Sequence, residues 1–122
     1  MNSGQILVVD DEQDVAEVAV FLLTSRGYAA RYAPNGEVAL QAILHNRVAL
    51  VLTDYMMPVM DGPELLQTLR TTKETAAIPV VMLSALPEEV VRAKVECIDA
   101  FIRKPFRAGQ LVKTVQEILG PP

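Results

Sequence analysis

Short apolar segments alternate with segments of helical periodicity along the whole chain. The apolar segments have the length of strands, and they cover Gln5–Asp10, Tyr28–Ala33, Val48–Asp54, Ile78–Leu83 and Ala100–Arg103. They are rich in Val, Ile and Leu without a regular polar alternation, as expected for parallel strands that helices cover on both faces. The second segment is less apolar than the others, and we therefore expect it at an edge of the sheet.

The segments between these strands have the periodicity and the end signals of helices. One helix is predicted from Gln13 to Arg26, and Gly27 can adopt the left-handed conformation that ends it. A second helix is predicted after Asn35-Gly36. Its buried face is expected to carry the apolar residues Val38, Ala39, Ala42 and Ile43.

Acidic residues and prolines mark the starts of two further helices. The segment Asp61–Glu64 supplies a capping acid, a proline in the first turn and an acid that interacts favourably with the helix dipole. The segment Pro87–Glu89 has the same character. The last helix has the clearest apolar stripe, which consists of Ala108, Leu111, Val112, Val115, Ile118 and Leu119.

Five strand–helix units in 122 residues predict an α/β fold, a three-layer sandwich with right-handed crossovers. The flavodoxin-like order 2-1-3-4-5 is the natural candidate for its five-stranded parallel sheet. A hydrophobic fraction of 51% is enough to build a core in a chain of this length. Because the chain has no linker, repeat or low-complexity segment, we expect a single domain over residues 1–122 and no effector domain.

Charge and composition exclude several classes of function. The net charge of −4 and the pI of about 4.9 argue against nucleic acid as a direct partner. No stretch approaches the length of a membrane span and no signal peptide precedes the first strand, so a soluble, cytoplasmic protein is expected. Cys97 is the only cysteine, which rules out an internal disulfide, and it is predicted to be buried. His45 is predicted on the surface.

Charged side chains stand where three of the predicted strands end. Asp10 and Asp11 follow the first strand, Asp54 ends the third and Lys104 follows the fifth. The carboxyl ends of parallel strands meet at one edge of an open sheet, so these side chains are expected in one small pocket. A nucleotide-binding fold would have a glycine-rich turn after the first strand. Carboxylates in its place indicate a Mg²⁺ site.

A structural interpretation of the same residues is also available. Asp10 and Asp11 can cap a helix, and Asp54 can be an ordinary turn residue. Neighbouring carboxylates repel each other by several kcal/mol, however, and this favours a bound cation beside them. An Asp54 oxygen next to the cation is then a nucleophile towards phosphorus. Ser84 follows the fourth strand, where a serine is usually a turn residue, and both Ser84 and Lys104 can bind a phosphoryl oxygen.

Together these residues resemble the motifs of response-regulator receiver domains (CheY-like), the phosphoacceptor half of two-component signalling. The matching positions are Val8–Glu12, Asp54, Met57-Pro58, Met60–Gly62, Ser84-Ala85 and Lys104–Phe106. The resemblance covers essentially the whole chain. It implies that Asp54 accepts a phosphoryl group from the phosphohistidine of a sensor histidine kinase or a phosphotransfer protein. It also implies a signalling switch and not an enzyme, since the only reactions it would catalyse are its own phosphorylation and its slow autodephosphorylation.

The same resemblance implies a role for each site residue. The Mg²⁺ ligands would be Asp11, Asp54 and the main-chain carbonyl of Met56, with Asp10 acting through water. Lys104 and Ser84 would hold phosphoryl oxygens. Phe101 stands three residues before Lys104, at the family's aromatic switch position, although packing in the core alone would also explain an aromatic residue there.

The resemblance also implies an output face formed by the fourth helix, the fifth strand and the fifth helix. Polar residues off the buried stripe of the fifth helix are available to a partner, and they are Arg107, Gln110, Lys113, Thr114 and Glu117. The downstream protein target and dimerisation on phosphorylation stay open. An alternative to a regulator with its own output is a phosphate relay or sink, a receiver from a hybrid histidine kinase or a larger regulator.

The chain departs from the family pattern at two places. The spacing from Ser84 to Lys104 is short, so the fourth helix or its entry loop is expected to be shortened. Cys97-Ile98 stands where family members often have Gly-Ala. Met56 and Leu86 are expected to flank the phosphoryl group with apolar side chains, which leads us to expect a long-lived phosphorylated state.

Two rival functions are less consistent with the residues. A phosphohydrolase of the haloacid-dehalogenase type needs a second acid two residues after its nucleophile, and Met56 occupies that position and has no proton to transfer. A docking module with a vestigial pocket would have no need of the complete set of site residues. Glu12, on the first turn of the first helix, is expected to be solvated.

Overall fold

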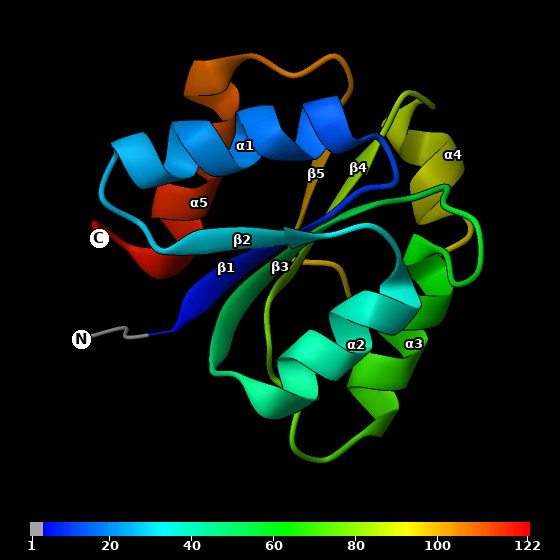
Figure 1. The fold of residues 1–122 in the computed structure, drawn as a ribbon. Coiled ribbons are helices and arrows are strands. Elements are labelled where there is room, and N and C mark those ends of the chain that lie inside the picture. The colour runs from blue at the N-terminus through cyan, green and yellow to red at the C-terminus, as the bar shows by residue number, and fades with distance from the viewer. Residues whose placement is uncertain (1–3) are drawn as a thin grey trace.

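Five parallel strands form one sheet in the order β2-β1-β3-β4-β5 in the computed structural model, which describes residues 4–122 (Figure 1). The strands are β1 (Gln5–Val9), β2 (Ala30–Ala33), β3 (Val48–Asp54), β4 (Val80–Ser84) and β5 (Ala100–Arg103). The predicted flavodoxin-like strand order is confirmed. The least apolar strand, β2, lies at an edge as expected.

Helices cover both faces of this sheet. They are α1 (Gln13–Ser25), α2 (Gly36–His45), α3 (Gly62–Thr71), α4 (Glu88–Arg92) and α5 (Ala108–Leu119). Helices α1 and α5 pack on one face, and α2, α3 and α4 on the other (Figure 1). All predicted elements are present, and α4 is only five residues long, in agreement with the short spacing in this region. Within residues 4–122, no helix has the length and apolar character needed to cross a membrane.

Local side-chain chemistry explains where several helices begin and end. Asp61 accepts a hydrogen bond from the Glu64 amide at 2.9 Å, and the Glu64 carboxylate accepts one from the Asp61 amide at 3.1 Å. This reciprocal capping box begins α3 at the predicted place. Asn35 caps α2 through the Val38 amide. Gly27 follows α1 with a φ of 99°, the left-handed conformation expected for it.

Each strand contributes side chains to two separate cores. In β1, Ile6 and Val8 face α1 and α5, whereas Leu7 and Val9 face α2 and α3. All four are at most 5% exposed. Because both faces are covered, alternation of side chains along a central strand such as β1 produces no polar positions, and its sequence is continuously apolar. The sheet is therefore packed on both faces below the edge where its charged residues gather.

Two positions of the predicted helix stripes are wrong. Val38 of α2 is 45% exposed, because the face that packs on the sheet carries Ala39 and Ile43, one turn apart. Ala108 is the first residue of α5 and is exposed, while Leu111 and the residues after it begin the buried stripe. His45 is exposed, as predicted.

The prediction that Cys97 is buried is also wrong. Cys97 is exposed and has a φ of 65° in the segment between α4 and β5. Its carbonyl accepts hydrogen bonds from Nη2 of Arg70 at 2.9 Å and from Nε at 3.3 Å. The main chain therefore turns here to offer its carbonyl to α3, and this turn directs the thiol to solvent. A left-handed position of this kind favours glycine over residues with a Cβ.

Candidate functional site

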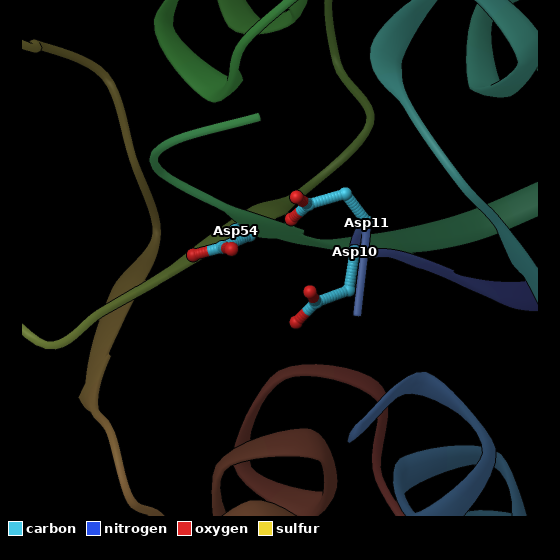
Figure 2. A group of neighbouring side chains, drawn as sticks. All are labelled: Asp10, Asp11 and Asp54. Carbon is cyan, nitrogen blue, oxygen red and sulfur yellow. The ribbon is translucent and has the colours of Figure 1, made fainter. Parts of the chain in front are cut away.

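Three carboxylates meet at the carboxyl ends of β1 and β3. Asp10 and Asp11 follow β1 directly, and Asp54 is the last residue of β3, whose Thr53 pairs with Val9 of β1. One oxygen from each carboxylate lies within 4.8 Å of the other two (Figure 2). Asp10 and Asp54 are 3% and 9% exposed, whereas Asp11 is exposed. The predicted acidic pocket is present, with one side open to solvent.

The two aspartates after β1 do not cap α1 in the usual way. The N-cap position of α1 is Glu12, whose side chain makes no capping hydrogen bond. Asp10 Oδ1 accepts a hydrogen bond from the Glu12 amide at 2.9 Å, which shapes the turn between β1 and α1. Its other oxygen, Oδ2, points to the charged pocket. Capping alone thus accounts for neither Asp10 nor Asp11.

Lys104 supplies the positive charge of this pocket. Its Nζ lies 2.7 Å from Asp10 Oδ2 and 3.3 Å from Asp54 Oδ2, and the side chain is 14% exposed. The Lys104–Pro105 peptide bond is cis, and the Lys104 amide donates to the Ser84 carbonyl at 2.8 Å. Burial lowers the pKa of Lys104, but the hydrogen bond that Lys104 donates to Asp10 and the charge of Asp54 outweigh this effect and raise the pKa above its ordinary value. Lys104 is therefore a fixed cation.

Asp54 is costly to ionise in spite of the neighbouring lysine. Burial raises the pKa of Asp54 to about 6, and the charge of Asp10 raises it as well. The charge of Lys104 and the hydrogen bond from the Tyr55 amide to Asp54 Oδ1, at 2.9 Å, oppose this increase without cancelling it. A group that costs free energy to ionise is stabilised by a nearby cation. The pocket is consequently suited to a hard divalent ion with oxygen ligands.

The remaining predicted site residues surround this pocket at different depths. Ser84 ends β4, is 3% exposed and follows Leu83, the residue that pairs with Asp54. Its Oγ accepts a hydrogen bond from the Leu86 amide at 3.0 Å. Phe101 pairs with Met82 in the sheet and packs, partly buried, on the side of α3 and α4. It packs against the core from its edge, and the structure does not bring it to the carboxylates.

Two apolar side chains lie on the rim of the site. Met56 follows Asp54 by two residues and is 67% exposed, and Leu86 is 37% exposed. Both are therefore placed to contact solvent or a ligand more than the core. Their positions follow from the loops after β3 and β4, which leave the sheet at the edge where the carboxylates meet.

Two residues of the matching motifs have contacts at the site that the sequence did not predict. Glu12 is solvated as expected, but its Oε1 also lies 3.8 Å from Nζ of Lys104. Gly62 is required by close packing, since a Cβ there would overlap the main-chain oxygen of Asp54 and lie 2.7 Å from Sδ of Met82. The signal for Gly62 was a glycine directly after a capping acid, where most helices have a better helix former.

Comparisons with known proteins agree with this geometry. Residues 6–116 match the family model of the response regulator receiver domain. The sensor histidine kinase TmoS of Ectopseudomonas mendocina is 34% identical over 117 residues, which are 94% of this chain and 12% of TmoS. The transcriptional regulatory protein SrrA of Staphylococcus aureus is 34% identical over 119 residues, 96% of this chain and 48% of SrrA.

A solved structure is similar in fold as well as in sequence. The signal receiver domain of a signal transduction histidine kinase from Syntrophus aciditrophicus superposes with a TM-score of 0.87 at 34% identity. The match covers 96% of this chain and 90% of that one. The chain thus spans about half of SrrA and a small part of TmoS, and nearly all of a receiver domain. Its fold, its acidic site and its sequence place the chain in the family of response regulator receiver domains of two-component systems.

Proposed function

We propose that the chain is a Mg²⁺-dependent switch that accepts a phosphoryl group on Asp54. The observation that supports this most is the group of three carboxylates within 4.8 Å, balanced by one lysine. Asp54 is a buried carboxylate whose pKa is raised, and its Oδ2 lies 3.3 Å from Nζ of Lys104. It therefore combines a nucleophilic oxygen with a neighbouring cation for the incoming charge.

The proposed metal ligands are all hard oxygens, which Mg²⁺ prefers. They are the carboxylates of Asp11 and Asp54 and the main-chain carbonyl of Met56, with Asp10 acting through water. Bound Mg²⁺ would offset the charge of these acids and polarise a phosphoryl oxygen. The fit rests on the mutual distances of the three carboxylates and on the cost of ionising Asp54, which is chiefly due to its burial.

The chain's own side chains would carry the transfer. An Asp54 oxygen attacks the phosphorus of a phosphohistidine, the O–P bond forms, the P–N bond breaks, and the imidazole leaves with the bonding electron pair. Lys104, already 3.3 Å from Asp54 Oδ2, donates to a phosphoryl oxygen. Ser84 binds another phosphoryl oxygen through its hydroxyl. Phe101 then senses the movement of Ser84 from its place in the core.

The proposed partners follow from this chemistry and from the family. The phosphodonor is a sensor histidine kinase or a phosphotransfer protein, and the domain acts in the cytoplasm. The downstream target is a protein bound at the face of α4, β5 and α5. No nucleic acid binds directly, in keeping with the net charge of −4. Phosphorylation-linked dimerisation would use the same face.

A phosphate relay or sink is the second candidate function. The similarity to a short part of TmoS favours it, because TmoS is a sensor histidine kinase. Residues 1–122 would then be a single receiver domain that passes its phosphoryl group to another protein. The two candidates differ in whether the phosphorylated domain binds a target or transfers its phosphoryl group onward.

The apolar rim leads us to propose a long lifetime for the phosphorylated state. Met56 and Leu86 offer no group that could orient an attacking water. We expect Met56→Asn to shorten the half-life of phosphorylated Asp54 several-fold, because an amide can hold that water by hydrogen bonds. Decay is followed by intact mass after removal of the phosphodonor. Loss of the wild-type phosphoryl group within seconds would contradict this proposal.

Acetyl phosphate with Mg²⁺, followed by intact mass spectrometry, tests the proposed function. We expect one added phosphoryl group on the wild type and none on Asp54→Asn, and no addition with a chelator present. A wild type that takes up no phosphoryl group would support the vestigial pocket. Continuous release of inorganic phosphate without a stable adduct would support a hydrolase.

A further inference from the structure

Arg103 joins the edge strand β5 to the segment that follows β4. It is the last residue of β5, is exposed, and lies opposite Ser84 in the register of the sheet. Its Nε donates a hydrogen bond to the carbonyl of Ala85 at 2.8 Å. The amide of Lys104, the residue after β5, donates to the carbonyl of Ser84, so Arg103 and Lys104 together hold the two consecutive carbonyls of Ser84 and Ala85.

The segment Ser84–Pro87 has few other restraints. Ala85 and Leu86 are exposed, and the Leu86 amide is bound by the Ser84 hydroxyl within the same segment. The helix that follows, α4, is only five residues long. Segments with exposed hydrogen bonds and few buried contacts open at low free-energy cost. The amides of Lys104 and Val90 hold the carbonyls of Ser84 and Pro87 at the two ends of the segment, and the bond from Arg103 holds the exposed Ala85 between them.

Phosphorylation of Asp54 would act on this segment directly. A phosphoryl group adds a charge of about −1.5 to −2 and three strong acceptor oxygens. Ser84 follows the residue that pairs with Asp54, and its hydroxyl already accepts from Leu86 while its proton remains available for donation. A movement of the Ser84 hydroxyl towards the phosphoryl group carries the attached Ala85 and Leu86 with it. That movement pulls the Ala85 carbonyl away from Arg103.

We propose that the Arg103–Ala85 hydrogen bond stabilises the unphosphorylated conformation of Ser84–Pro87 and must break when Asp54 is phosphorylated. Arg103 is thus a positioning residue that sets how readily the site accepts a phosphoryl group. This inference rests on the proposed function and adds a determinant of its equilibrium. It also explains why an arginine fits here: Nε is held in a fixed plane, so the bond has a direction that a lysine ammonium lacks.

The affinity for beryllofluoride, a stable phosphoryl mimic, tests the proposal. The dissociation constant in the presence of Mg²⁺ is measured by calorimetry for the wild type, Arg103→Met and Arg103→Lys. We expect Arg103→Met to bind about three- to tenfold more tightly, the equilibrium effect of losing one partly exposed hydrogen bond in the unbound state. We expect Arg103→Lys to fall between the two. Arg31→Met is the matched control, since Arg31 is also exposed and lies on β2, at the opposite edge of the sheet; the affinity of this variant should stay within twofold of the wild type.

Amide hydrogen exchange supplies a second measurement, without metal or mimic. We expect Arg103→Met to raise the exchange rate of the Leu86 amide about three- to tenfold and to leave that of Val81, in the core of β4, unchanged. Unchanged or weaker beryllofluoride binding by Arg103→Met would overturn the proposal, because Arg103 would then only close the strand end or would itself stabilise the phosphorylated state. A wild type that binds no beryllofluoride would refute the proposed function, and this inference with it.

Discussion

Replacing the proposed phosphoacceptor should make the metal-free protein more stable. Asp54 has a pKa of about 6 in the folded protein, compared with 3.8 for an unperturbed aspartate, chiefly because it is buried. The difference of about 2 units corresponds to at most about 3 kcal/mol between the protonated and ionised forms. Partial access of solvent to the pocket reduces this to about 1–2 kcal/mol. Asp54→Asn has the polarity of the protonated acid and avoids the cost of ionisation.

The dependence on pH has a definite sign. A carboxyl group whose pKa is raised by folding holds its proton more tightly in the folded state. Its contribution to stability is complete below about pH 3.8 and is lost as the pH rises through about 6. The stability gained by Asp54→Asn should therefore be small near pH 4 and reach about 1–2 kcal/mol at pH 7.5.

Urea denaturation with a chelator, at several values from pH 4 to 7.5, measures this difference. Asp99→Asn is the control, because the Asp99 carboxylate accepts hydrogen bonds from the Val80 amide at 2.7 Å and from Arg70 at 3.2 Å. Its loss of charge should lower stability by up to about 1 kcal/mol. If Asp54→Asn is no more stable than the wild type at pH 7.5, or if its advantage does not vary with pH, our account of the electrostatics of the site is wrong.

Three further substitutions test the packing and charge around the site by urea denaturation. Gly62→Ala should lower the free energy of unfolding by more than about 2 kcal/mol, because the added Cβ would overlap the end of β3. Gly109→Ala on α5, where the added Cβ has open space, should raise it by about 0.5–1 kcal/mol. Equal effects of the two substitutions would contradict this. Lys104→Met should lower stability by about 2–3 kcal/mol at pH 7 without metal, because it leaves the buried carboxylates of Asp10 and Asp54 unpaired. Added Mg²⁺ should restore part of this loss. A loss that Mg²⁺ does not change would contradict a metal site shared by these carboxylates. Cys97→Gly should be neutral or slightly stabilising and Cys97→Val should cost about 1 kcal/mol or more, since φ is 65° there; the opposite order would refute the left-handed turn.

The strand order and the position of the acidic site could be predicted because both follow from the alternation of strands and helices along the chain. A short, continuously apolar segment indicates a parallel strand with both faces covered. Its last residue lies at the edge of the sheet where the carboxyl ends of the strands meet. Asp10 and Asp54 therefore met as predicted. The ends of strands were less predictable, as at β2, which begins at Ala30 and not at Tyr28. The side chain of Tyr28 instead donates to the Gly120 carbonyl at 2.6 Å, a contact that local sequence does not show.

Long-range contacts account for what the sequence did not predict. The exposure of Cys97 depends on Arg70, 27 residues away, which draws the carbonyl of Cys97 towards α3. Composition alone favours a buried cysteine. The approach of Glu12 to Lys104 likewise depends on how β5 ends. Such contacts depend on how the helices and strands are placed relative to one another, and the periodicity of the sequence does not predict this placement.

A crystal structure with Mg²⁺ and beryllofluoride would test the central claim most directly. We expect beryllium bonded to an oxygen of Asp54, one magnesium ion coordinated by Asp11 and Asp54, and Lys104 in contact with a fluoride. A structure in which magnesium or beryllofluoride binds away from these residues, or in which both leave the pocket of Asp10, Asp11 and Asp54 empty at saturating concentrations, would contradict it.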